Sequence, residues 1–163
     1  MHLLSKHLRI KSFGILALVL ISVLGGACSR GPKDLDDPKK VLSEYISKSF
    51  NVRGSEDRKV LLDYLTGEAK TRLAAWSDEQ FLSAFSETKR VFVKFLVREV
   101  KPISDGKVEI TYEIIYLDQT PGRDAKITNK KMSQLRFESG RWAIAEVRNI
   151  KELVEYRNEM ALP

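Results

Sequence analysis

Strict alternation of side-chain character over residues 108–116 is the feature that most constrains the fold of this chain. Every second residue there is large and apolar or aromatic: Val108, Ile110, Tyr112, Ile114 and Tyr116. Three of the residues between them are polar: Glu109, Thr111 and Glu113. Successive side chains of a β-strand point to opposite faces, so this pattern predicts a strand with one face on a core and the other towards water.

Three further segments of the second half read as strands. Before the alternating segment, Val91, Val93, Phe95 and Val97 recur at every second position. Ser104-Asp105-Gly106 then predicts a turn, and residues 118–126 predict a polar loop around Pro121-Gly122. Residues 127–138 predict a third strand whose alternation shifts near Met132, and a tight hairpin at residues 138–142 leads into a fourth strand over 141–147.

The first half has helical spacing and helix-start signals. Asp37 followed by Pro38 predicts one helix start, and Ser77 with Gln80 predicts a capping box at another. Asn149 with Glu152 predicts the start of a last helix, whose apolar face would carry Ile150, Leu153, Val154, Arg157 and Met160. Helices followed by a four-stranded antiparallel twisted sheet make an α+β domain over residues 37–163.

The N-terminal segment is typical of an export signal. Lys6, Arg9 and Lys11 precede an apolar run over residues 13–24, which ends in small residues before the single cysteine, Cys28. Basic, apolar and small regions in this order predict a signal peptide over residues 1–27. An uncleaved membrane anchor is the competing interpretation. The uncharged stretch ends in two glycines, which are poor helix formers, so the helix that it can form is short for a bilayer core of about 30 Å.

Cys28 indicates which class of signal peptide this is, because a single cysteine in an exported chain cannot form an internal disulfide and must have another role. Leu24, Gly25, Gly26, Ala27 and Cys28 together resemble the lipobox of bacterial lipoproteins, with Leu24 one place further from the cysteine than usual. The resemblance implies that Cys28 carries lipid and that residues 28–36 are a short tether. In the sorting pattern of enteric bacteria, a serine after the lipidated cysteine, here Ser29, implies transport to the outer membrane. The domain would then face the periplasm or the cell surface. An ordinary signal peptide with a chance cysteine is the alternative.

Charge and residue content narrow the possible chemistry. Of 28 Lys and Arg residues, three lie in the leader, which leaves 25 against 22 Asp and Glu, so nucleic acid is not an expected partner. Both histidines, His2 and His7, also lie in the leader. Without histidine or a free thiol, the remaining chain offers no zinc site and no nucleophile pair that needs histidine. We expect no metal and no cofactor.

The order of elements and the ending "LRFESGRWAIAEV" resemble small nuclear-transport-factor-2-like (cystatin-like) domains, which also occur as bacterial lipoproteins. The resemblance covers roughly residues 37–147 and implies a sheet that wraps around the helices as a cone. Enzymes of that family use Asp/His pairs inside the cone, and this domain has no histidine. The resemblance therefore implies a fold and not a catalytic activity.

Several side chains have two interpretations. Trp76 and Trp142 either stack on a ligand or belong to the core, which we expect. Tyr112 and Tyr116 either line a pocket or close the core edge; together with Pro121, Gly122 and Arg123 they form the candidate binding surface. The third predicted strand is basic and carries Lys126, Lys130, Lys131 and Arg136. These side chains form either a solvated face or a contact surface for anionic lipid head groups.

The function expected from the sequence is a non-catalytic, lipid-anchored lipoprotein of the bacterial cell envelope. Its domain would bind an envelope protein or a small ligand, and its lipid would bind the membrane. The alternative is a periplasmic enzyme that uses a carboxylate, with Glu109, Glu113 and Glu138 as candidates. Alternation argues against this alternative, because these glutamates lie opposite the apolar faces.

Overall fold

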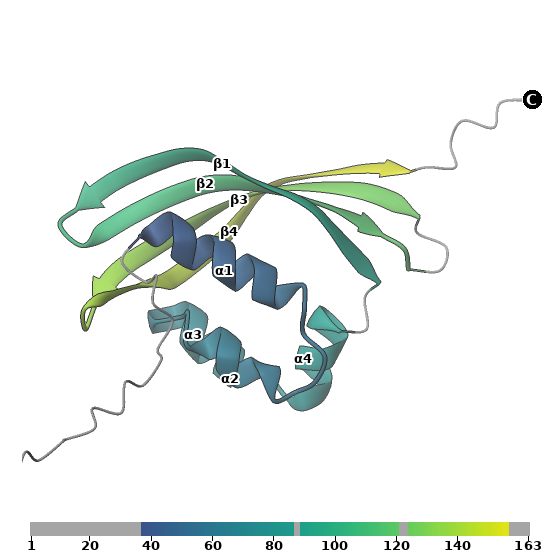
Figure 1. The fold of residues 1–163 in the computed structure, drawn as a ribbon, viewed down its shortest axis with the longest axis horizontal. Coiled ribbons are helices and arrows are strands. Elements are labelled where there is room, and N and C mark those ends of the chain that lie inside the picture. Colours follow the sequence, from purple (N-terminus) through teal and green to yellow (C-terminus); the bar gives the residue numbers. More distant parts are fainter. Residues whose placement is uncertain (1–36, 87–88, 121–123, 157–163) are drawn as a thin grey trace, which may run out of the picture. The chain divides into compact units, whose positions relative to one another are not determined.

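The computed structural model describes residues 37–86, 89–120 and 124–156, and it confirms the predicted α+β architecture. Four helices precede four strands (Figure 1). The helices are α1 (Pro38–Ser49), α2 (Asp57–Leu62), α3 (Gly67–Ala74) and α4 (Asp78–Phe85). The strands are β1 (Arg90–Ser104), β2 (Lys107–Asp118), β3 (Ala125–Glu138) and β4 (Arg141–Tyr156). None of the helices in these ranges is long and apolar enough to cross a bilayer.

Two helices begin where their capping residues predict. Asp37 accepts a hydrogen bond from the Lys39 amide at 2.9 Å, with Pro38 in the first turn of α1. At α4, the Ser77 hydroxyl accepts from the Gln80 amide at 3.1 Å, and the Gln80 side chain accepts from the Ser77 amide at 2.9 Å. Both arrangements satisfy amide groups that have no partner within the helix.

The strands form one antiparallel sheet in the order β1-β2-β3-β4. Both predicted hairpin turns are confirmed. Between β3 and β4, Ser139 and Gly140 have φ values of 53° and 79°. Two consecutive residues with positive φ suit the right-handed twist of a two-residue hairpin.

All four helices lie on one side of the sheet, which we call the inner face (Figure 1). The segment between α2 and α3 pairs with β4: the Thr66 amide donates to the Ile144 carbonyl at 2.9 Å, and the Ile144 amide donates to the Tyr64 carbonyl at 2.8 Å. The predicted inward side chains of β2 are confirmed, with Ile110 fully buried and Tyr112 2% exposed. Glu109 and Glu113 lie on the opposite, outer face.

The predicted alternation of β1 over residues 91–97 is wrong at its start, because a bulge at Val93 interrupts the pairing with β2. Val91 lies opposite Leu117 on the outer face, whereas Phe95 and Val97 lie opposite Ile114 and Tyr112 on the inner face. The pairing shifts between Phe92 and Lys94, and again between Val97 and Glu99 and between Pro102 and Ser104. An extra residue at each bulge exchanges the two faces of the strand that follows.

The predicted C-terminal helix is also wrong, because residues 149–156 continue β4 and pair with the first half of β3. Ile150 is an extra residue at a bulge in β4. Ile150 and Leu153 of the predicted helix face are exposed, at 54% and 48%, and Val154 lies opposite Ile127 on the inner face of the sheet. The other two residues of the predicted helix face, Arg157 and Met160, lie outside the described residues.

Candidate functional site

A partly enclosed cavity of about 250 Å³ lies between α1, α4 and the inner face of the sheet, and we call it the inner cavity. Aromatic rings form much of its wall: Tyr45, Phe50, Phe85, Tyr112 and Tyr116. Its two charged lining residues are Arg90 at the start of β1 and Lys131 in the middle of β3, and no described carboxylate lines it. The inner cavity is therefore aromatic and cationic.

Lys131 reaches this cavity because the alternation of β3 never shifts. Side chains at odd positions face inward along the strand, and Ala125, Ile127, Ser133 and Leu135 are all buried. The predicted shift near Met132 is wrong: the strand keeps its register, and polar side chains occupy inward positions in its middle. The interpretation of the basic third strand as one solvated face is therefore wrong for Lys131.

The other polar side chains in the middle of this face have hydrogen-bond partners. The Tyr112 and Ser133 hydroxyls lie 3.1 Å apart, and both side chains are buried. The Asn129 amide donates to the Tyr116 hydroxyl at 3.3 Å. Among the described residues, neither a hydrogen bond nor an ion pair is formed by the Lys131 ammonium. A half-buried ammonium without a bound partner is unusual, because buried charges are normally paired.

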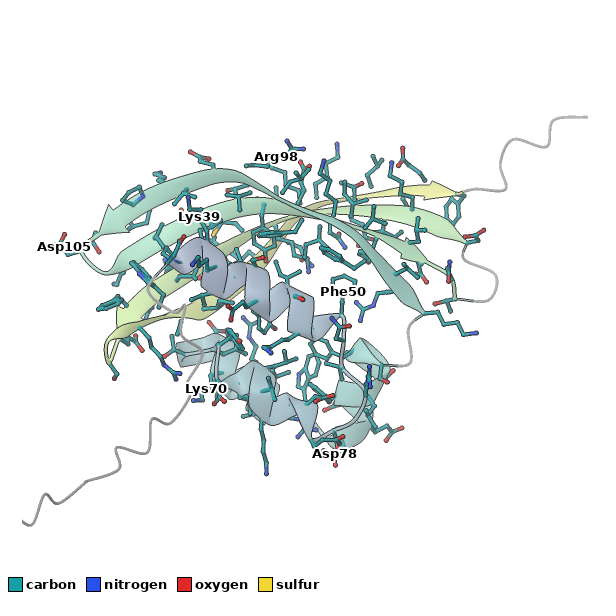
Figure 2. All side chains as sticks on the ribbon, viewed as in Figure 1. Lys39, Phe50, Lys70, Asp78, Arg98 and Asp105 are labelled. Carbon is teal, nitrogen blue, oxygen red and sulfur yellow. The ribbon has the colours of Figure 1, made fainter. Side chains whose placement is uncertain are left out.

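Arg90 is held in place by neutral neighbours. Its guanidinium carbon lies 5.7 Å from the centre of the Phe50 ring and 5.9 Å from that of Tyr116. One of its terminal nitrogens donates to the Ala84 carbonyl of α4. Phe50 lies between the end of α1 and the sheet (Figure 2). These cation–π contacts orient Arg90 without neutralising its charge.

Burial changes the acidity of the groups around the cavity. It lowers the pKa of Lys131 below its ordinary value, with Arg90 acting in the same direction and Glu152 opposing it. Burial raises the pKa of Tyr45 to about 12, with Tyr112 as a second cause. It also raises the pKa of Tyr112 to about 12, against the hydrogen bond from Ser133. At neutral pH both hydroxyls stay protonated and are suited to hydrogen bonding, not to proton abstraction.

A second cavity of about 360 Å³, the side cavity, lies against α3 and α4. It shares four lining residues with the inner cavity: Tyr45, Phe85, Lys131 and Val147. Its further wall includes Leu73 and Trp76. The prediction that Trp76 is a core residue is wrong, since it is 37% exposed and lies 6.0 Å from the Phe85 ring. The prediction that Trp142 packs inward is confirmed, because it contacts the core beside Phe137.

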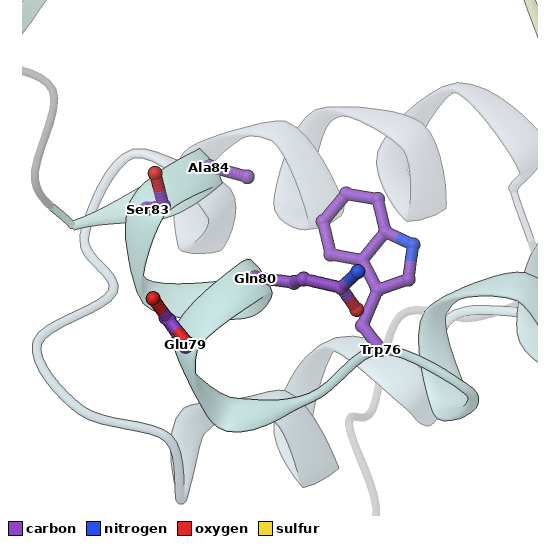
Figure 3. A pocket seen from close by; sticks show the side chains of 5 residues that line it. All are labelled: Trp76, Glu79, Gln80, Ser83 and Ala84. Carbon is purple, nitrogen blue, oxygen red and sulfur yellow. The ribbon is translucent and has the colours of Figure 1, made fainter.

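A larger hollow of about 640 Å³ lies on the surface at α4. Figure 3 shows the Gln80 side chain beside the Trp76 indole, with Glu79 and Ser83 pointing away from the ring. The Gln80 amide is already engaged in the capping box of α4. Because this hollow brings together no charged pair and no free polar cluster, the inner cavity is the stronger candidate site.

The candidate carboxylates lie away from the inner cavity. Glu113 forms an ion pair with Arg98 at 2.6 Å, and Arg98 projects from the face opposite the helices (Figure 2). Glu109 lies on the same outer face, 3.9 Å from Arg148, and Glu138 accepts a hydrogen bond from the Thr66 hydroxyl at 2.7 Å. In the described ranges, no three His, Cys, Asp or Glu side chains gather as a metal site requires.

The structure places only part of the predicted binding surface. Tyr112 and Tyr116 belong to the core edge and also line the inner cavity, so both interpretations of these tyrosines apply. Pro121, Gly122 and Arg123 lie outside the described residues, as do Cys28, the leader and the tether. Arg90 was not predicted as a site residue, and Lys131 was predicted on a solvated face. The odd-numbered spacing from Ile127 to Leu135 was a usable signal for Lys131, because it places that residue on the inner face.

No protein-family model matches this sequence, and a search of curated proteins finds no relative. Among solved structures, the chain is similar to the solution structure of a SEC-C motif containing protein from Rhodopseudomonas palustris. The TM-score is 0.50 at 13% sequence identity, and the likeness covers 70% of this chain and 79% of that one. At this level of identity the comparison shows a shared small α+β fold with a four-stranded antiparallel sheet.

Proposed function

We propose that this chain is a non-catalytic lipoprotein of the bacterial cell envelope that binds a small ligand or a protein partner through its α+β domain. The domain would be a distant nuclear-transport-factor-2-like one, with the inner cavity in place of that family's cone interior. The observation that carries the binding role is the inner cavity, which Arg90 and Lys131 line together with five aromatic side chains. The observation that carries the anchoring role is the lipobox-like segment that ends at Cys28.

Lipid on Cys28 would be the only link to the membrane that this proposal needs. Each buried methylene contributes about 0.8 kcal/mol, and two or more acyl chains hold a protein stably in a leaflet. The tether over residues 28–36 is short, so the domain would stay close to the bilayer surface. Ser29 favours the outer membrane, with the domain facing the periplasm or the cell surface.

Binding is favoured over catalysis by the chemistry of the cavity wall. The tyrosine hydroxyls there keep their protons at neutral pH, and the glutamates considered as catalysts lie elsewhere. General acid–base catalysis needs a group whose pKa lies near the working pH and whose atom reaches the substrate. The wall supplies cations, hydroxyl donors and aromatic surface, which are recognition groups.

Metabolic labelling with a fatty acid tests the anchor. The wild-type chain should incorporate the label, and Cys28→Ala should not, because no other residue of that segment can carry a thioether-linked lipid. Ser29→Ala is the matched control and should keep the label while testing the sorting signal. Label on the Cys28→Ala variant, or none on the wild type, contradicts the anchoring proposal.

Photo-crosslinking in intact cells tests the binding site. A photoreactive residue in place of Tyr116, on the wall of the inner cavity, should capture a bound ligand or partner. The same residue in place of Thr111, on the outer face of the same strand, is the matched control and should capture far less. Equal capture at both positions would place the binding surface elsewhere.

A further inference from the structure

We infer that the inner cavity takes an organic oxyanion, whose charged group lies between Arg90 and Lys131 and whose apolar body extends into the side cavity. The inference rests on the proposed binding role of the inner cavity and names the chemical class of its ligand. The charged group is a carboxylate or a phosphonate-like group. The body is flat or aliphatic and packs against Phe85 and Trp76.

Arg90 and Lys131 bring uncompensated positive charge to the inner cavity. Arg90 and Lys131 are close enough for the charge of Arg90 to disfavour that of Lys131. In the described part of the chain, neither side chain forms an ion pair with a carboxylate. Two cations that share a partly buried site repel one another, and an anion between them converts that repulsion into attraction.

The N–H donors of Arg90 and Lys131 are available to an oxyanion in the inner cavity. A guanidinium has five N–H donors, and the described residues supply Arg90 with one acceptor, the Ala84 carbonyl. Phe50 and Tyr116 hold its plane in position from neighbouring elements. Lys131 adds three donors from β3. A pre-oriented arginine fork beside an ammonium is well suited to the oxygens of a carboxylate or a phosphate.

Glu152 is the acidic residue whose charge raises the pKa of Lys131, against the effect of burial. It lies on β4 opposite Asn129, is exposed, and makes no ion pair with Lys131. Its charge offsets part of the positive potential at the cavity. Removal of that charge should therefore strengthen binding of an anion.

The site continues into a mostly apolar space. The side cavity meets the inner cavity at Phe85 and Lys131, and its further wall includes Leu73, Trp76 and Arg72, whose guanidinium lies 3.7 Å from Glu68. The volumes of about 250 and 360 Å³ fall together in the range of about 300–1,000 Å³ that is usual for small-molecule sites. A ligand with a charged end and an apolar body would contact both parts.

Calorimetric titration of the full chain in phosphatidylcholine nanodiscs tests the inference, with heats from empty nanodiscs subtracted. The probes share one naphthalene body and differ in charge: 2-naphthoate, 2-naphthylphosphonate, the neutral 2-naphthalenemethanol and the cationic 2-naphthylmethylamine. Both anions should bind at least about tenfold tighter than the alcohol, which corresponds to about 1.4 kcal/mol, and the amine should bind weakest. The ratio between the two anions distinguishes a carboxylate site from a phosphate site.

Variants assign the effect to named groups. Lys131→Gln should lower naphthoate affinity about tenfold, towards that of the alcohol, because it removes a charge-assisted contact. Lys130→Gln makes the same change one residue away on the outer face and should leave affinity unchanged. Arg90→Gln provides a second test at the site if Lys131→Gln proves unstable, and Glu152→Gln should tighten anion binding.

The outcomes separate the inference from the proposed function. Equal affinity for the anions and the alcohol overturns the inference and leaves a binding cavity of another specificity. An equal loss in Lys130→Gln and Lys131→Gln also overturns it, because general surface charge would then explain the binding. If no naphthalene probe of any charge binds, both the inference and the cavity's binding role are contradicted, while the anchor at Cys28 is unaffected.

Discussion

Lys130 and Lys131 are neighbours in β3, and their ammonium groups lie on opposite faces of the sheet. Lys130 lies opposite Glu113 on the outer face, where the hydrogen bond from Arg98 lowers the pKa of that carboxyl group and the charge of Lys130 acts in the same direction. Lys131 lies opposite Tyr112 on the inner face and lines the inner cavity. The same residue type therefore lies near an outer-face carboxylate at one position and, at the next, is half-buried in a cavity without an ion pair to any described residue.

This difference predicts a conflict between stability and binding at Lys131. Lys131→Met should raise the free energy of unfolding at neutral pH by about 1 kcal/mol, because it keeps the length of the side chain and removes a desolvated charge. The same variant should lose anion binding. Urea denaturation monitored by circular dichroism measures the stability change, and Lys130→Met is the control, expected within about 0.5 kcal/mol of wild type.

The sign of the pH dependence at Lys131 follows from its lowered pKa. A folded protein that binds this proton less tightly than the unfolded chain gains stability as pH rises from the lowered pKa towards the ordinary value of 10.5. Lys131→Met should lack this gain. A Met variant that is less stable than wild type at neutral pH would contradict the charge argument.

The strand register of β2 predicts unequal effects for two adjacent truncations. Ile110→Ala removes a fully buried side chain and should cost about 2–5 kcal/mol. Glu109→Ala removes an outer-face side chain 3.9 Å from Arg148 and should change stability by about 0.5 kcal/mol or less. Chemical denaturation midpoints compare the two, and similar midpoints would mean that the register is different.

The hydrogen bond between Tyr112 and Ser133 should couple the two residues energetically. Tyr112→Phe leaves the fully buried Ser133 hydroxyl without this partner and should cost about 1–3 kcal/mol. Adding Ser133→Ala to Tyr112→Phe should restore part of that loss, since no unpaired hydroxyl then remains. A double-mutant cycle measures the coupling, and simple additivity of the two single changes would show that the contact does not form.

The buried tyrosines predict a loss of stability at high pH. The pKa values of Tyr45 and Tyr112 are raised from 10.0 to about 12, so between these values the folded state keeps protons that the unfolded chain releases. Stability should therefore fall as pH rises from about 10 to about 12. Absorbance titration of tyrosinate alongside thermal melting checks this, and Tyr45→Phe should flatten the fall. Normal titration of both hydroxyls near pH 10 without unfolding would contradict it.

Much of the fold follows from local sequence signals. The caps at Asp37 and Ser77 and the turns at Gly106 and Gly140 need only neighbouring residues to act, and each lies where the sequence predicts. The alternation of β2 also predicts its buried face, because its apolar side chains all lie on one face of the strand and only that face can pack against a core. None of these features depends on which other strand lies alongside.

The bulged strands could not be predicted in the same way. Val93 and Ile150 each fall where the residue pairing between two strands shifts, and such a shift is a property of the pair. In β4 the sequence alone favours a helix after the shift. The pairing partner decides the outcome, since the first half of β3 needs the backbone groups of residues 149–156 for its hydrogen bonds.

The sequence by itself determined that helices precede a four-stranded sheet, and it determined the caps, the turns and the inward face of β2, because these features are set by patterns of residues close in the chain. Only the tertiary structure decided that Lys131 and Arg90 share a cavity. Their separation along the chain carries no signal of proximity, and β2 lies between their strands in the sheet. The alternation of β3 places Lys131 on the inner face, but no pattern in the sequence brings Arg90 to the same place, so the charge pair emerges only when register, bulges and helix packing are combined.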